Sequence, residues 1–135
     1  MIGELGQLAE IACGCRDTYL RYSGGPEADA RQTSRDYESG LELPGLSVVP
    51  LTPPDWWRRP VADWLVRQVC KYAQLGEGDA DRYPWILAGR IVGRGPDDEP
   101  LVADPQPLAV LSDGLVDEAR SHYHERFEVG RDSQG

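Results

Sequence analysis

Apolar residues recur at three- and four-residue spacing near both ends of the chain, which is the pattern of an amphipathic helix. The first pattern predicts a short helix that ends at Gly14. The last pattern predicts a helix that Ser112 and Asp113 cap at its amino end. The apolar positions of the two helices are, in chain order, Leu5, Leu8, Ile11 and Ala12, and then Leu115, Val116, Ala119 and Tyr123.

The strongest helical pattern lies over residues 61–75, directly after Pro60, which suits a first helical turn. Gly76 and Gly78 follow the pattern and predict the end of this helix. One face is apolar apart from a glutamine, and the charged residues lie elsewhere. The apolar face consists of Val61, Trp64, Leu65, Gln68, Val69 and Tyr72, and the charged positions are Asp63, Arg67 and Lys71.

Four other segments have the composition of strands. Thr18–Ser23 is rich in β-branched and aromatic residues and stops at two glycines. Residues 46–51 form a short apolar strand, which Pro50 ends or confines to the edge of a sheet. Residues 84–93 are the longest apolar run and residues 107–111 are a shorter one, and both predict buried strands.

The remaining segments are polar. Residues 24–45 are rich in turn-forming residues and predict a long surface loop with room for one helical turn. The order of elements predicts a single α+β domain over residues 1–129, with a small mixed or antiparallel sheet and about three helices. Residues 130–135 are expected to form a flexible tail.

Composition fits this interpretation, because 135 residues with 40% hydrophobic and 27% charged residues are typical of one globular domain. The net charge of −9 disfavours a nucleic-acid backbone or an anionic membrane as the partner, because both are polyanions. A small-molecule or protein ligand is compatible with this net charge. A local pair of arginines can outweigh distant charges within a Debye length of about 8–10 Å.

The amino terminus lacks the basic start and continuous apolar core of a signal peptide, and no apolar run reaches the roughly 18–20 residues that span a bilayer. We therefore expect a cytoplasmic protein. The spacing of Cys13, Cys15 and Cys70 favours reduced thiols over a disulfide framework. A metal site that combines the first two cysteines with His122 or His124 lacks four well-spaced ligands, so we predict no metal.

Arg21, with Ser23 and Gly24, is the first candidate for a ligand-binding site. A charge inside an otherwise apolar strand must find an anion, because an unpaired buried charge is very costly. A guanidinium can hold a phosphate through two hydrogen bonds. The structural alternatives are that Arg21 faces solvent or pairs with an internal aspartate or glutamate.

Ser47 and the acidic run of Asp97, Asp98 and Glu99 are the other candidates. A hydroxyl in a short strand can orient a ligand or a carboxylate, or can simply satisfy a neighbouring backbone group. Three consecutive carboxylates between apolar runs can bind a cation, polarise a hydroxyl or stabilise positive charge in a sugar ring. A solvated acidic turn has the same sequence, and both alternatives stay open.

Trp56 and Trp57 are adjacent, so both cannot point inward along a regular element. We expect one of them to line a pocket or to contact a partner.

The order of an arginine on an early strand, a serine on a later strand before a helix, and a glutamate beside a late strand resembles the Arg–Ser–Glu triad of ADP-ribosyltransferases. The resemblance implies that Arg21 holds the phosphates of NAD and that Ser47 supports the nicotinamide pocket and orients the glutamate. It implies that Glu99 binds the ribose 2′-hydroxyl and stabilises the oxocarbenium-like centre, with Asp97 as a second acidic residue.

Three segments also resemble a family of short, uncharacterised actinobacterial proteins; they are RYSGGPEAD, LPGLSVVPL and GRGPDDEPLV. This likeness spans most of the chain and implies no activity. The sequence therefore gives two main functional hypotheses. One is an NAD-dependent enzyme similar to ADP-ribosyltransferases, and the other is a non-catalytic acidic module that binds a partner. A third alternative is an enzyme of another class that modifies a small molecule through Asp97, Asp98 or Glu99.

Overall fold

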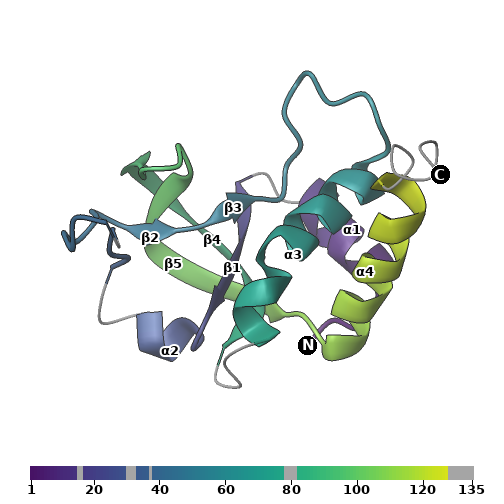
Figure 1. Cartoon of the computed structure of the whole chain (residues 1–135), viewed down its shortest axis with the longest axis horizontal. Helices are drawn as coiled ribbons and strands as arrows, with labels where there is room; N and C mark the ends of the chain where they lie inside the picture. Colours follow the sequence, from purple (N-terminus) through teal and green to yellow (C-terminus); the bar gives the residue numbers. More distant parts are fainter. Residues whose placement is uncertain (15–16, 30–32, 37, 78–81, 128–135) are drawn as a thin grey trace.

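Helices and strands are interspersed along the chain, and every pair of neighbouring strands is antiparallel, as in an α+β fold. The computed structural model describes residues 1–14, 17–29, 33–36, 38–77 and 82–127 (Figure 1). The helices are α1 (Leu5–Gly14), α2 (Pro26–Asp29), α3 (Val61–Glu77) and α4 (Asp113–Phe127). The strands are β1 (Thr18–Ser23), β2 (Leu46–Ser47), β3 (Val49–Pro50), β4 (Tyr83–Arg94) and β5 (Pro100–Val110).

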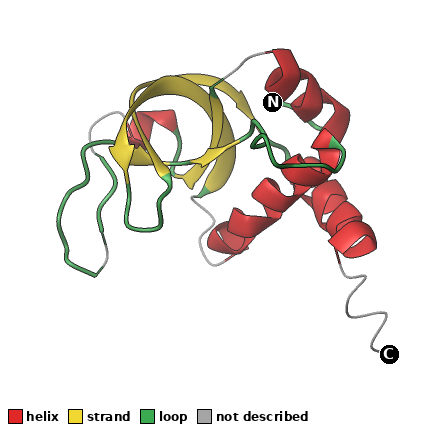
Figure 2. Ribbon diagram, turned by 90° about the horizontal axis from the view of Figure 1, so that it is seen from above, coloured by secondary structure: helices red, strands yellow, loops and turns green. Residues whose placement is uncertain are grey.

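The strands form one antiparallel sheet in the order β2-β5-β4-β1-β3. β2 and β3 lie on opposite edges of this sheet, although only Val48 separates them in the chain. Leu46 pairs with Val102 of β5, whereas Val49 pairs with Leu20 of β1. The segment 46–50 therefore joins both edges, and the sheet is bent into the nearly closed curl that Figure 2 shows.

The curled sheet has two hydrophobic cores, because side chains alternate between the two faces of a strand. Tyr19, Trp85 and Leu87 point to the inside of the curl, whereas Leu20 and Ile86 point outward to the helices. The buried residues of the inner core come from four segments of the curl and are Tyr19, Leu46, Val48, Trp85, Leu87 and Val102.

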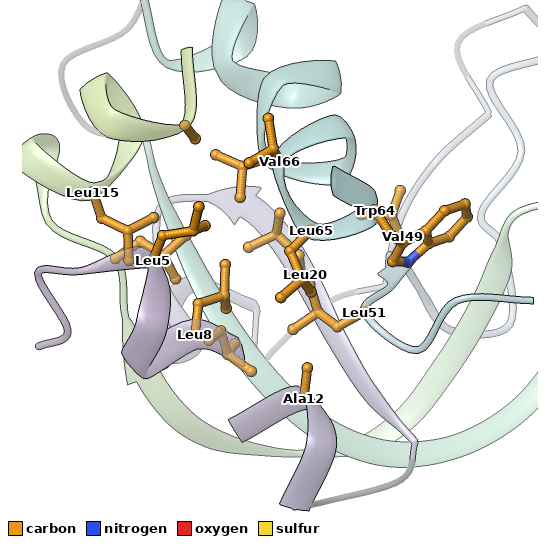
Figure 3. Packing of buried hydrophobic residues seen from close by; sticks show 14 of the residues in the cluster. Leu5, Leu8, Ala12, Leu20, Val49, Leu51, Trp64, Leu65, Val66 and Leu115 are labelled. Atoms are coloured by element: carbon orange, nitrogen blue, oxygen red, sulfur yellow. The ribbon is translucent and has the colours of Figure 1, made fainter. Parts of the chain in front are cut away.

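The outer core lies between the sheet and α1, α3 and α4, which gather on one side of the molecule (Figures 1 and 3). Leu8, Leu65 and Leu115 contribute to it from the three helices, and each is 0% exposed. Truncating one such leucine to alanine typically costs roughly 2–5 kcal/mol. The amphipathic patterns that predicted these helices therefore correspond to the principal core of the fold.

The boundaries of the helices follow local signals in the sequence. Ser112 Oγ accepts a hydrogen bond of 3.1 Å from the backbone N–H of Leu115, which confirms the predicted cap of α4. α1 ends at Gly14, as predicted. α3 continues through Gly76 to its last residue, Glu77, and Gly78 lies outside the described residues.

The strand predictions are confirmed for β1, which has the predicted bounds, and need revision elsewhere. The predicted strand 46–51 is divided into β2 and β3, which pair with different neighbours. The run 84–93 is buried only over 84–87, because the outer half of the long β4–β5 hairpin extends beyond the helices (Figure 1). The run 107–111 belongs largely to the end of β5, and Leu108 is exposed as the extra residue of a bulge.

Asp63 was predicted to lie away from the buried face of α3, and this prediction is wrong, because its side chain is only 1% exposed. Three groups surround its carboxylate: His122 Nε2 at 2.8 Å, Arg59 Nε at 3.1 Å and Arg126 Nη2 at 3.3 Å. A buried carboxylate requires such partners. The cluster of Asp63, Arg59, His122 and Arg126 forms a polar joint between α3 and α4, and a helical period alone does not reveal it.

No helix in the described ranges combines the length and apolar character that crossing a membrane requires. Cys13 and Cys70 are free thiols, and Cys15 lies outside the described residues. Within the described part of the chain, no group of three or more His, Cys, Asp or Glu side chains could hold a metal ion. The predicted tail, 130–135, also lies outside the part that the structure describes.

Candidate ligand-binding cleft

A polar cleft of about 680 Å³ opens beside the point where the segment 46–50 closes the sheet. Its walls come from β1, the end of α2, the loop before β2, the segment 46–50 and the turn between β4 and β5. Six of the predicted site residues line this one cleft, and they are Arg21, Ser23, Gly24, Ser47, Asp97 and Glu99. Asp98, the other predicted residue of the acidic run, is not part of this lining. The chain thus brings together residues that are far apart in the sequence.

Arg21 is paired inside the protein. Its Nε donates to Asp29 Oδ2 at 2.7 Å and its Nη2 donates to Asp29 Oδ1 at 3.3 Å. Its Nη1 donates to the backbone oxygen of Ser47 at 2.7 Å and to Ser34 Oγ at 3.3 Å. The side chain is 14% exposed, and these four hydrogen bonds leave the guanidinium little capacity for a ligand. Arg21 therefore pairs with an internal aspartate, which is one of the structural alternatives that the sequence left open. It also positions the backbone of Ser47.

Ser23 is also occupied by protein groups. Its hydroxyl donates to Asp29 and accepts hydrogen bonds from Trp85 Nε1 at 2.9 Å and from the Gly25 N–H at 3.1 Å. One donor and two acceptors exhaust the capacity of a serine hydroxyl. Ser23 therefore anchors the end of β1 to α2, and the neighbouring Gly24 is exposed at the wall of the cleft.

Ser34 is a member of this network that the sequence reasoning missed. Its hydroxyl accepts hydrogen bonds from Arg21 Nη1 at 3.3 Å and from the Ser47 N–H at 2.8 Å. A serine in the polar segment 24–45 carries no distinguishing signal. The sequence predicted an internal carboxylate as a partner for Arg21 but did not identify it as Asp29. The sequence PEAD of α2 and the glycines before it do favour a short helical turn at Pro26–Asp29.

Ser47 and Glu99 meet at the wall of the cleft. Ser47 Oγ donates a hydrogen bond of 2.8 Å to Glu99 Oε2. Because Arg21 holds the backbone oxygen of Ser47, the three residues form one connected network. A guanidinium, a hydroxyl and a carboxylate therefore lie at one hollow, with the guanidinium behind Ser47.

The acidic run has three different roles within the turn that joins β4 to β5. The Gly95 N–H donates to the backbone oxygen of Glu99 at 2.9 Å, and the Asp98 N–H donates to the backbone oxygen of Gly95 at 3.0 Å. Asp98 has a positive φ of 60°, a left-handed conformation that aspartate tolerates better than most residues. The Asp97 N–H donates to Glu99 Oε1 at 3.1 Å. Two of the three acids thus build the turn that presents the third.

Gly95 is required by the position of the Glu99 side chain. A Cβ added at Gly95 would overlap both carboxylate oxygens of Glu99. By contrast, a Cβ added at Gly93 would meet nothing closer than 3.8 Å. Gly95, which has no side chain, therefore allows the Glu99 carboxylate to fold back over the turn and reach Ser47.

The tryptophans and histidines singled out by the sequence lie outside the lining of the cleft. Trp56 is 64% exposed, and its ring centroid lies 6.1 Å from that of Trp57 and 6.5 Å from that of Trp64. Trp56 thus faces outward, and neither tryptophan lines this cleft, so contact of one of them with a partner stays a prediction. His122 contributes to the joint with Asp63 instead.

The fold and the site define a small α+β domain with a curled antiparallel sheet and a polar cleft at its closure. The chain belongs to a family of unknown function, DUF6098, whose profile matches residues 1–134. This confirms the predicted resemblance to an uncharacterised family. No curated protein and no solved structure matches the chain, so the resemblance to ADP-ribosyltransferases gains no support from these comparisons.

Proposed function

We propose that the cleft binds a small molecule with ribose-like hydroxyl groups at Glu99, and that NAD-dependent ADP-ribosyl transfer is the reaction that its residues support best. The observation that carries the proposal is the hydrogen bond between Ser47 and Glu99 at the wall of the cleft. The bond fixes the carboxylate without neutralising it, because its donor is an uncharged hydroxyl.

Glu99 has acceptor capacity left for a ligand. Its two carboxylate oxygens accept one protein hydrogen bond each, from Ser47 and from the Asp97 N–H, and a carboxylate offers about four acceptor positions. A free position can accept a ribose hydroxyl. A fixed negative charge beside a sugar ring also stabilises the positive charge that develops when a bond at C1′ breaks.

In the proposed reaction, the bond between ribose C1′ and the nicotinamide nitrogen breaks, and its electron pair leaves with nicotinamide. A hydroxyl, amine or water nucleophile forms the new bond to C1′ and releases its proton to solvent. Glu99 acts on the reacting sugar, whereas Ser47 and Arg21 are positioning residues. The acceptor could be a protein, a nucleic acid or a small molecule.

The test is release of nicotinamide from NAD by the full chain. We expect Glu99→Gln to lower the rate by about 100-fold or more, as removal of one stabilising group in an active site commonly does. Ser47→Ala should lower it less, because the carboxylate remains. Glu42→Gln is the matched control, since Glu42 lines the same cleft with a side chain that is 71% exposed. No release by the wild type, or equal rates for Glu99→Gln and wild type, would overturn the proposal.

A non-catalytic binding module is the second candidate, and the exposed Trp56 favours it. The rings of Trp56, Trp57 and Trp64 contact one another edge to face, and Arg67 lies 5.4 Å from the Trp64 ring centre. Such rigid aromatic and arginine groups are typical of protein interfaces. Loss of protein capture by Trp56→Ala, with capture retained by Glu99→Gln, is the result that this function requires.

A further inference from the structure

We propose that Arg82 holds an anionic phosphate group of the ligand, at the end of the cleft opposite to Glu99. The identity of the ligand as a phosphate ester with a ribose rests on the proposed function, whereas the anion site itself does not. Neither Arg21 nor Ser23 can supply this contact, because protein partners occupy both.

Arg82 is the unpaired guanidinium among the described residues that line the cleft. It is half-buried and lines the cleft, and within the described ranges it makes no hydrogen bond or ion pair. Among the described residues of the lining there are two other arginines, and both are paired, Arg21 with Asp29 at 2.7 Å and Arg35 with Glu42 at 3.8 Å. A guanidinium that is always charged and has no partner is suited to a phosphate, which it can contact through two parallel hydrogen bonds.

The strand register places Arg82 far from Glu99 along the cleft. Arg82 directly precedes Tyr83, which pairs with Ser23 at the end of β1. Two positions back along β1, Arg21 reaches the backbone oxygen of Ser47, whose hydroxyl reaches Glu99. The order along the wall is therefore Arg82, Arg21, Ser47 and Glu99, with the 12 residues of β4 between the first and the turn that carries the last.

Charge then sets the orientation of the ligand. Asp97 and Glu99 make the turn end of the cleft negative, so that end repels a phosphate and accepts hydroxyl groups or positive charge. Arg82 attracts a phosphate at the other end. A ligand that carries a phosphate at one end and a ribose at the other, as each half of NAD does, can place its phosphate at Arg82 and its ribose at Glu99.

The test measures binding of inorganic pyrophosphate to the full chain by titration calorimetry. We expect Arg82→Gln to weaken binding by roughly tenfold to a hundredfold, the effect typical of losing hydrogen bonds to a charged group. Arg82→Lys should retain part of the affinity. Arg90→Gln is the matched control, because Arg90 is an exposed arginine of β4 outside the cleft that pairs with Asp104 at 3.1 Å. It should bind pyrophosphate as the wild type does.

Pyrophosphate that fails to bind the wild type, or binds Arg82→Gln equally well, would overturn the anion site. The two proposals fail separately. If pyrophosphate binding depends on Arg82 but NAD is not cleaved, the anion site stands and the proposed reaction is wrong. If NAD is cleaved through Glu99 but Arg82→Gln changes neither pyrophosphate binding nor the KM for NAD, the reaction stands and the role of Arg82 is wrong.

Discussion

The Ser47 hydroxyl donates a hydrogen bond of 2.8 Å to Glu99 Oε2 across 52 positions of sequence. Ser47 belongs to the short segment that joins both edges of the curled sheet, and Glu99 ends the turn between the two longest strands. Closure of the sheet therefore brings the two side chains together. The same closure forms the wall of the cleft, so the geometry of the site and the integrity of the fold depend on one contact region.

Gly95→Ala should displace the Glu99 carboxylate with little loss of stability. The new methyl group would occupy the space of the carboxylate oxygens, and a flexible side-chain end can move away at low cost. The Asp97 amide, which donates to Glu99 Oε1, reports the displacement by NMR chemical shift. Gly93→Ala is the control, since its Cβ has space, and it should leave the Asp97 amide signal in place. An unchanged signal in Gly95→Ala would contradict the described position of Glu99.

Asp29→Asn should destabilise the protein by about 2–4 kcal/mol, because it leaves the charge of Arg21 poorly compensated in a largely buried position. Urea denaturation measures the change in the free energy of unfolding. Asp104→Asn removes the partner of Arg90, an exposed pair with side chains 67% and 81% exposed, and should produce no measurable change. Equal stability of Asp29→Asn and wild type would show that Arg21 does not depend on this pair.

Acid should weaken the joint between α3 and α4. Burial alone would raise the pKa of Asp63, but the hydrogen bond with His122 and the charges of Arg126 and Arg59 outweigh it and hold the pKa below its ordinary value. The folded state therefore binds this proton less readily than the unfolded chain does. The stability that Asp63 contributes is complete above the unfolded pKa, about 3.9 for aspartate, and is lost as the pH falls through the lower folded value.

Urea denaturation from pH 7 to pH 2 tests the predicted direction in which the free energy of unfolding changes with pH. Asp63→Asn should be less stable than the wild type at pH 7, and the difference should shrink below about pH 4 as the wild-type carboxylate becomes protonated. A constant difference over the whole range would contradict the lowered pKa of Asp63.

Tyr22→Phe should leave stability at neutral pH unchanged or increase it. The Tyr22 hydroxyl is buried and, in the part of the chain that the structure describes, has no hydrogen-bond partner, so its removal relieves an unmet desolvation cost. Burial raises the pKa of Tyr22 to about 12. The wild type should therefore lose stability as the pH rises from about 10 towards 12, and the loss should be smaller in Tyr22→Phe, in which Tyr19 still has a raised pKa. A clear loss of stability in the variant at pH 7 would reveal a partner for the hydroxyl.

Much of the architecture was predictable because it depends on local periodicity. The apolar spacing in α1, α3 and α4 matches the faces that pack on the sheet, and the composition of Thr18–Ser23 gave the bounds of β1. The cap at Ser112 is likewise a local signal. The burial of Asp63 was not predictable, because its partner His122 and the arginine Arg126 lie on another helix, about sixty positions further along the chain.

The candidate site was predictable in its residue types and not in its pairing. Arg21, Ser47 and Glu99 stood out because each is polar within an apolar context, and all three line one cleft. The sequence could not show that Asp29 would neutralise Arg21, since several carboxylates were available. Nor could it show that Arg82 would be left unpaired among the described arginines of the lining.

By itself the sequence determined α1, α3 and α4, the first strand, the α+β class and the polar residues around which a site could form. Each of these follows from interactions between residues close together in the chain, which leave a periodic or compositional trace. Only the tertiary structure decided that Val48 would separate two strands on opposite edges, and which guanidinium would be paired and which left free. Those outcomes depend on which of several possible contacts between distant residues form. The register and closure of the whole sheet decide which contacts form.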